Sequence, residues 1–101
     1  GPAYRSHKIE GSKIRVVFDH LGQGLAFRHA KELKGFEIAG EDGKWQWAKA
    51  EIDGDSVLLS HPDVTKPKNV QYAFNRDPSY ANLYNKDGLP ALPFTSVDWK
   101  Y

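Results

Sequence analysis

A β-hairpin is predicted by residues 48–59, Ala48-Lys49-Ala50-Glu51-Ile52-Asp53-Gly54-Asp55-Ser56-Val57-Leu58-Leu59. As far as Ile52, small or apolar residues alternate with charged ones, which is the period-2 pattern of a strand with one buried face. Asp53-Gly54 then supplies a turn, because glycine tolerates the positive φ that a tight hairpin needs. The apolar run Val57-Leu58-Leu59 is typical of a central strand covered on both faces.

The same two signals recur along the rest of the chain. A glycine beside an acidic residue marks three further turns, at Glu10-Gly11, Asp42-Gly43 and Asp87-Gly88. Alternating apolar residues define three more strand faces: Ile14, Val16 and Phe18; Phe36 and Ile38; and Val70, Tyr72 and Phe74. Short strands at roughly 8–12-residue spacing predict an all-β fold, a jelly-roll-like antiparallel β-sandwich.

Two segments depart from this pattern. The segment from Leu25 to Leu33 fits either a short helix or a strand followed by a loop, and the sequence leaves both open. After Asp77 the alternation gives way to a chain rich in proline and asparagine. We expect an irregular C-terminal tail packed on the sandwich, whose apolar residues cover it. These are Leu83, Tyr84, Leu89, Leu92 and Phe94.

Length and composition bound the possible functions. With 101 residues, 40% of them hydrophobic, we expect residues 1–101 to form one domain with one modest core. The 14 basic and 13 acidic residues leave a net charge of +1, which gives no reason to expect nucleic acid or a membrane surface as partner. No apolar run is long enough to predict a transmembrane segment. The lack of cysteine excludes a disulfide framework.

The C-terminal stretch has an unusual and specific composition. It runs Ala81-Asn82-Leu83-Tyr84-Asn85-Lys86-Asp87-Gly88-Leu89-Pro90-Ala91-Leu92-Pro93-Phe94, and it follows the strand-like Val70-Gln71-Tyr72-Ala73-Phe74 and the turn Asp77-Pro78. This arrangement resembles the closing segment of the sialate O-acetylesterase family. Upstream segments resemble the last domain of that family too: Gly1-Pro2, Tyr4, the strand from Gly11 to Phe18, residues 33–44 and Trp47-Ala48.

The resemblance spans nearly the whole chain but only a small C-terminal part of a typical family member. It implies a noncatalytic accessory domain, cut from a carbohydrate esterase whose catalytic Ser, Asp and His lie in a preceding α/β domain. The absence of methionine agrees with a piece of a longer product, and Gly1-Pro2 fits either a cleavage remnant or native sequence. The resemblance further implies a periplasmic or secreted parent enzyme that acts on O-acetylated sugars.

One catalytic motif is imitated within the hairpin. Gly54-Asp55-Ser56-Val57-Leu58 mimics the Gly-Asp-Ser-Leu block that carries the nucleophile in the wider esterase superfamily. That block requires a strand-to-helix turn and an Asp-x-x-His that activates the serine. Here the serine opens a strand, and Leu58 stands where an aspartate would precede His61. We therefore expect Ser56 to be structural and the chain not to be an enzyme.

The remaining titratable residues indicate no cofactor. The four histidines, His7, His20, His29 and His61, are spaced too irregularly for a metal site. Most aspartates stand beside glycine or proline, where turn formation alone selects them. A structural Ca²⁺ held by several turn carboxylates is an alternative that this spacing does not specify.

Aromatic residues supply the candidate binding site. Phe, Trp and Tyr make up 13% of the chain. If Ala48, Ala50 and Ile52 point to the core, alternation places Trp45, Trp47, Lys49 and Glu51 together on the outer face, with the two indoles about 7 Å apart. A flat aromatic pair flanked by hydrogen-bonding groups suits a pyranose ring. The C-terminal Trp99 and Tyr101 are further carbohydrate-binding candidates.

Three interpretations of the tryptophan pair stay open. A bulge would turn Trp45 or Trp47 into the core, an exposed pair would form a docking surface for the catalytic domain, and a flat pair would form a sugar platform. Three functions follow for the chain: a structural accessory domain, a carbohydrate-binding module, or a complete small esterase. The expected partner is therefore carbohydrate, the parent catalytic domain, or both.

Overall fold

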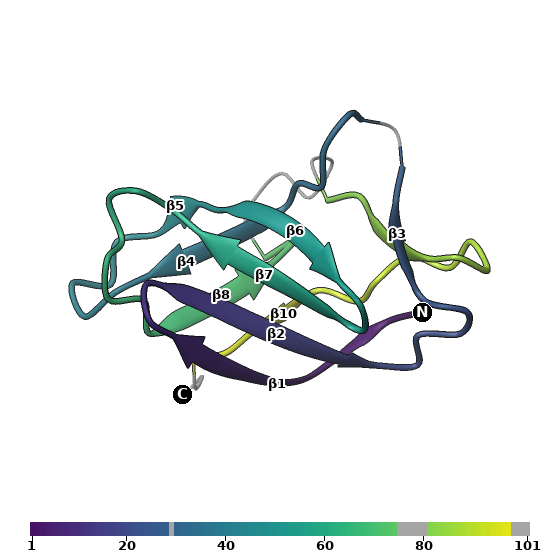
Figure 1. Ribbon diagram of the computed structural model, residues 1–101, viewed down its shortest axis with the longest axis horizontal. Helices are drawn as coiled ribbons and strands as arrows, with labels where there is room; N and C mark the ends of the chain where they lie inside the picture. The colour runs from purple at the N-terminus through teal and green to yellow at the C-terminus, as the bar shows by residue number, and fades with distance from the viewer. Residues whose placement is uncertain (29, 75–80, 98–101) are drawn as a thin grey trace.

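Two stacked antiparallel sheets and a small third sheet form the molecule (Figure 1). The computed structural model describes residues 1–28, 30–74 and 81–97. The first sheet has the strand order β1 (Ala3–Glu10), β2 (Lys13–Asp19), β7 (Ser56–Ser60) and β6 (Lys49–Asp53). The second has the order β10 (Phe94–Thr95), β8 (Asn69–Tyr72), β4 (Phe36–Ala39) and β5 (Gln46–Trp47). The third pairs β3 (Leu25–Phe27) with β9 (Leu83–Asn85).

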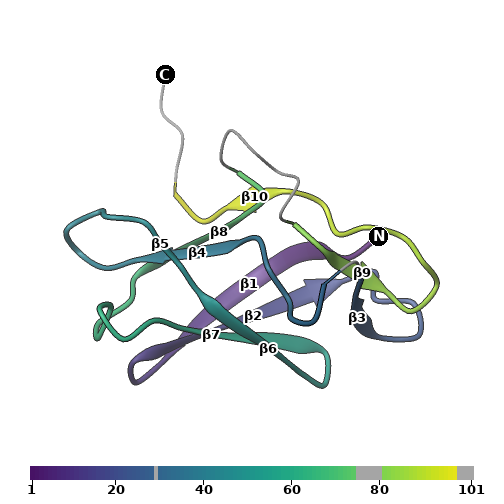
Figure 2. The same ribbon diagram turned by 90° about the horizontal axis from the view of Figure 1, so that it is seen from above.

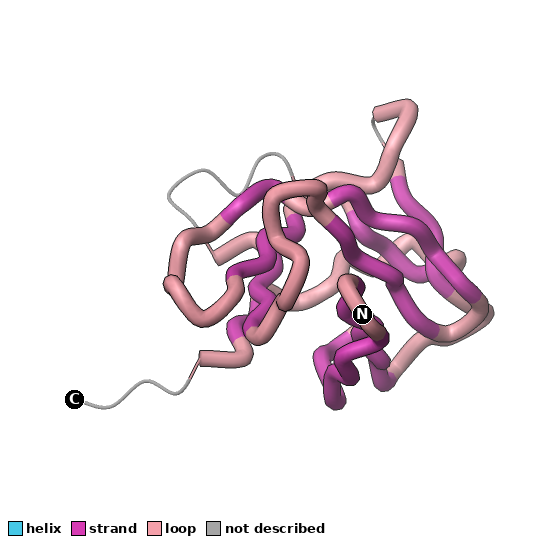
Figure 3. The backbone as a smooth tube through the Cα atoms, turned by 60° about the vertical axis from the view of Figure 1, so that its left-hand side comes forward, coloured by secondary structure: helices cyan, strands magenta, loops and turns pink. Residues whose placement is uncertain are grey.

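The predicted all-β class is confirmed. Seen from above, the second sheet lies over the first, with the third sheet at one end (Figure 2). All described residues lie in strands or loops (Figure 3), and none of them belongs to a helix long and apolar enough to cross a membrane. The segment from Leu25 to Leu33, for which a helix was one alternative, begins with strand β3 and continues as a loop.

Glycine turns close the two hairpins of the first sheet. Glu10 pairs with Lys13 across one turn, and Asp53 pairs with Ser56 across the other. In both loops the first of the two central residues is glycine, with φ of 63° at Gly11 and 61° at Gly54. A two-residue loop requires this left-handed conformation to match the twist of its strands, which explains why these turns could be predicted.

Alternation predicts the core correctly over most of its length. The alternating apolar residues of β2, Ile14, Val16 and Phe18, are each at most 3% exposed, and the predicted core residues of β4 and β8 are similarly buried. Phe74 is the exception, because it is 40% exposed. Ala73 takes a φ of 54° directly after β8, which ends the strand and breaks the alternation before Phe74.

The C-terminal tail is more regular than expected. It contributes β9 to the third sheet and β10 to the second, and Leu83 and Phe94 enter the core as predicted. The prediction is wrong for Leu89 and Leu92, which are 53% and 56% exposed. These two residues are held by their backbone and not by side-chain burial. The Leu89 amide donates to Asn85 Oδ1, and the Leu92 amide donates to the Pro2 carbonyl.

Tyr72 links β8 to the tail and makes the stability sensitive to alkaline pH. Its hydroxyl accepts a hydrogen bond of 2.8 Å from the Leu83 amide, and burial raises the pKa of Tyr72 from 10.0 to about 12. A raised pKa means that the neutral phenol stabilises the fold below pH 10, and that this contribution is lost as the pH rises from 10 to about 12.

We therefore expect Tyr72→Phe to lower the free energy of unfolding by about 1–3 kcal/mol at pH 8, because the Leu83 amide loses its buried acceptor. Above pH 10 the difference between wild type and variant should shrink, since only the wild type loses the contribution of this phenol. Urea unfolding of both proteins at pH 8 to 12 measures this difference. A difference that stays constant over this range would contradict the assignment.

Candidate functional site

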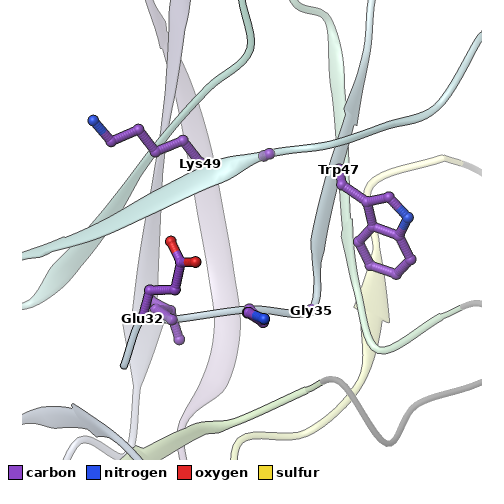
Figure 4. A pocket seen from close by; sticks show the side chains of 7 residues that line it. Glu32, Gly35, Trp47 and Lys49 are labelled. Carbon is purple, nitrogen blue, oxygen red and sulfur yellow. The ribbon is translucent and has the colours of Figure 1, made fainter. Parts of the chain in front are cut away.

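A pocket of about 370 Å³ opens where the chain passes from the second sheet to the first. β5 ends at Trp47 and β6 begins at Lys49, so the intervening Ala48 connects strands of different sheets. The backbone of Ala48 is anchored by a hydrogen bond of 2.9 Å from its amide to the Phe36 carbonyl. Residues 32–35 form the opposite wall, and in Figure 4 they lie across the pocket from residues 47–49.

The pocket combines an apolar lining with a charged rim. Leu33, which is 5% exposed, and the half-buried Ala48 supply aliphatic surface, and Trp47 supplies an indole. The charged rim consists of Glu32, Lys34 and Lys49, all of them exposed. Such a lining offers both a stacking surface and hydrogen-bonding groups to a small polar ligand.

Asn82 holds the loop that forms one wall of the pocket. Its Oδ1 accepts a hydrogen bond of 2.7 Å from the Lys34 amide, and its Nδ2 donates to the Glu32 carbonyl at 3.0 Å. The Asn82 side chain is 5% exposed, so these bonds are shielded from water. Sequence reasoning missed this role, although Asn82 belongs to the C-terminal motif that was singled out.

The register of β4 and β5 decides where the two tryptophans point. Ile38, which is fully buried, pairs with Gln46, and the half-buried Glu37 pairs with Trp47. Directly paired residues share a face, so Trp47 lies on the outer face of the second sheet. It is 49% exposed, which excludes the predicted alternative of a Trp47 turned into the core. Trp45, two residues earlier, precedes β5 and is half-buried.

The expectation that Lys49 and Glu51 share this face is wrong. Both belong to β6, where Ala50 pairs with the buried Leu59 and Ile52 with the buried Val57, so Lys49 and Glu51 point outward from the first sheet. Their side chains approach each other at 3.4 Å. Figure 4 shows Lys49 and Trp47 directed away from one another across the pocket. The alternation itself is intact, but the chain changes sheet at Ala48.

Two of the candidate binding residues, Trp99 and Tyr101, lie outside the described residues. The tryptophan that the structure places at the pocket is therefore Trp47, with Trp45 beside it in the sequence. Carbohydrate binding by any of these residues stays a prediction.

Ser56 occupies a structural position at the start of β7. Its hydroxyl donates to the Asp53 carbonyl at 2.8 Å and accepts from Arg15 Nη1 at 2.7 Å, and the residue is 7% exposed. The same guanidinium contacts Glu10 at 2.7 Å and Asp53 at 2.8 Å. Its hydrogen bond lowers the pKa of the Glu10 carboxyl. Through Arg15, this network connects the turn after Glu10 to the turn after Asp53. The Ser56 hydroxyl is one of its members.

Two of the described histidines, His7 and His61, make local hydrogen bonds. His7 Nδ1 lies 2.7 Å from the Tyr4 hydroxyl, and His61 Nδ1 accepts from the Asp63 amide within a turn. His29 lies outside the described part of the chain. Within that part, no group of three or more His, Asp or Glu side chains is arranged to hold a metal ion.

Comparison with solved structures finds several similar chains. The chain is similar to part of a carbohydrate acetylesterase from Xanthomonas citri, at 37% sequence identity and a TM-score of 0.91. The match covers 97% of this chain and 23% of that enzyme. It confirms the likeness to a domain of a carbohydrate acetylesterase that the sequence suggested.

Two other comparisons were negative. No family model matches the chain, and no curated protein matches it.

Proposed function

We propose that this chain is a noncatalytic accessory domain of a carbohydrate O-acetylesterase and that it contributes to carbohydrate binding. The observation that carries the proposal is the match of nearly the whole chain to 23% of a carbohydrate acetylesterase. The match covers a domain-sized part of that enzyme and excludes most of its length. This supports a function for the domain that is separate from the catalytic function of the rest of the enzyme.

The noncatalytic role is supported by the geometry of Ser56. A serine nucleophile needs a base that takes its proton and an exposed hydroxyl. The Ser56 hydroxyl instead faces the Arg15 guanidinium and a backbone carbonyl. An arginine cannot accept a proton at neutral pH, so this contact offers no activation.

Carbohydrate binding is supported by the surroundings of Trp47. A half-exposed indole beside a pocket with a charged rim matches what a sugar requires, since its C–H face stacks on the ring while its hydroxyls bond to polar groups. The proposal extends to acetylated sugars as ligands and, from the sequence resemblance, to a sialate-type esterase in the periplasm or outside the cell.

A purely structural role is the alternative. In that case the domain packs on the catalytic part of the enzyme and binds no sugar itself. The exposed Leu89 and Leu92 of the tail favour this alternative, because packing on a second domain would bury both side chains. The two roles are compatible, since a domain can dock through the tail and bind through the second sheet.

A binding screen of the domain tests the proposal. We expect calorimetry and tryptophan fluorescence to show saturable binding to at least one member of a panel of plant polysaccharides, host glycans and acetylated oligosaccharides. Trp47→Ala should weaken that binding at least about tenfold, because a stacked aromatic anchor contributes much of the binding energy.

The matched control is Phe27→Ala, which removes another exposed aromatic, 40% exposed on β3, away from the pocket. It should leave the affinity unchanged. If the folded wild-type domain binds no member of the panel, carbohydrate binding is refuted and the purely structural role is favoured. Binding that Trp47→Ala does not weaken would place the site elsewhere on the domain.

A further inference from the structure

The segment before β10 carries a run of exposed apolar residues. Within residues 89–93 (the tail loop), four of the five residues are exposed: Leu89, Pro90, Leu92 and Pro93. Leu89 and Leu92, 53% and 56% exposed, are the most exposed large apolar side chains in the part of the chain that the structure describes. The tail loop therefore presents two leucines and two prolines on its surface.

Hydrogen bonds fix the backbone of the tail loop. The Leu89 and Ala91 amides donate to acceptors on β9, and the Leu92 amide donates to the Pro2 carbonyl, each at 2.9 Å. The two remaining residues of the loop are prolines, which have no N–H group. A surface whose backbone is already ordered loses little conformational entropy when a partner binds to it.

The same hydrogen bonds decide what the tail loop can recognise. Each N–H group of the loop is bonded within the chain, and the exposed side chains contain no polar atom. A sugar needs donors and acceptors for its hydroxyls, so this surface suits it poorly. An apolar protein surface suits it well, because burial of the two leucines removes apolar area from water.

The first residues of the chain lie against the tail loop. Pro2 is fully buried, and its carbonyl accepts the hydrogen bond from the Leu92 amide. An added Cβ at Gly1 would collide with the Pro90 carbonyl. Figure 2 shows the N-terminus beside this part of the tail. Any residue that precedes Gly1 in a longer chain therefore begins next to the tail loop.

The position of Gly1 argues for one partner. The carbohydrate acetylesterase from Xanthomonas citri matches this chain over only 23% of its own length, and the sequence resemblance implies that the catalytic part precedes this domain. A part that is tethered at Gly1 by a short linker reaches the tail loop at an effective concentration on the order of millimolar. A modest apolar contact is then enough for docking.

We propose that the tail loop is the surface on which the catalytic part of the acetylesterase docks. An apolar face of that part covers Leu89 and Leu92, and the contact fixes the orientation of the two parts of the enzyme. The inference rests on the proposed accessory role in an acetylesterase and deepens it, since it assigns the contact to residues 89–93.

The experiment compares the complete acetylesterase with the 101-residue chain, each carrying Leu89→Ser and Leu92→Ser together. In the complete enzyme we expect protease cleavage before Gly1 to become at least about tenfold faster, because the docked state protects that segment and the variant populates it less. Calorimetry should show one unfolding transition for the wild type and two for the double variant. In the 101-residue chain the double variant should melt within about 4 °C of the wild type, since exposed side chains contribute little to its stability.

Ile9→Ser is the matched control. Ile9 is also an exposed aliphatic residue, at 43%, and it lies near the end of β1 that is farther from Gly1. In the complete enzyme its cleavage rate and its single unfolding transition should equal those of the wild type. Leu92→Ser alone, which removes one side chain as the control does, should accelerate cleavage several-fold.

The outcomes separate this inference from the proposed function. If the complete enzyme releases acetate from acetylated oligosaccharides but the double variant is cleaved and unfolds like Ile9→Ser, the docking surface is overturned and the accessory role stands. If the complete protein releases no acetate, the proposed function and the partner named here are both refuted.

Two results with the 101-residue chain would also overturn the docking surface. The first is a fall of more than about 10 °C in the melting temperature of the double variant, because the leucines would then stabilise the domain itself. The second is a dimer of the wild type, detected by light scattering, that the double variant dissociates. In that case the loop binds a second copy of the chain.

Discussion

Phe36→Ala is expected to lower the free energy of unfolding by about 3–5 kcal/mol. Phe36 is fully buried between the sheets. Its ring centroid lies 4.6 Å from that of Tyr72 and 6.4 Å from those of Phe18 and Phe94. Truncation would remove the transfer free energy of the ring and leave a cavity that three aromatic neighbours on different strands cannot all fill. Domains of this size are stable by only about 5–15 kcal/mol, so the loss is severe.

Urea or guanidinium unfolding measures the effect. For a domain of about 100 residues, we expect the melting temperature to fall by roughly 15 °C or more. Phe27→Ala is the control, since it removes the same ring from a position that is 40% exposed and should cost far less. A Phe36→Ala variant within about 1 kcal/mol of the wild type would show that the aromatic cluster repacks and that the sheets are held by other contacts.

Gly35→Ala is expected to destabilise the domain by about 2–5 kcal/mol, although it adds a single methyl group. Gly35 has a φ of 106°, which residues with a side chain rarely adopt. An added Cβ would lie 2.7 Å from Ala81 Cα and 3.1 Å from Tyr72 Cε1. The first of these contacts is with backbone, so the segment before β9 would have to move away from the sandwich.

Gly43→Ala separates strain from collision. Gly43 also has a positive φ, of 71°, but an added Cβ there meets no atom within 4 Å. This control should cost only about 1 kcal/mol, the price of a left-handed conformation for alanine. The two variants are compared by chemical denaturation. Equal losses at both positions would mean that the close approach of Ala81 is relieved without cost.

The sequence predicts the strands of this fold better than it predicts their assignment to sheets. Alternation identifies buried residues such as Ile14 and Phe36, because burial on one face acts on every second residue of a strand. The alternation of small or apolar residues with polar ones continues unbroken from β5 into β6. It therefore does not indicate that the chain changes sheet at Ala48. Lys49 was therefore placed beside Trp47, although it belongs to the opposite layer.

Hydrogen bonds to the backbone of distant residues explain the other features that the sequence did not predict. The aromatic candidate Trp47 was found because an indole beside charged residues is conspicuous in the sequence. Asn82 was overlooked, because its importance comes from the backbone of Lys34, which is 48 positions away. The exposure of Leu89 and Leu92 was likewise not predictable, since it follows from where backbone hydrogen bonds fix the tail.

The passage of the chain at Ala48 has a consequence for how the domain unfolds. One residue joins the edge of one layer to the edge of the other, and its amide is bonded to the Phe36 carbonyl. The layers therefore cannot separate along this edge unless the β4–β5 ladder or the β6–β7 ladder breaks first. Local opening beside Trp47 is coupled in this way to the opposite layer, and both layers should lose their amide protection together, as one cooperative unit.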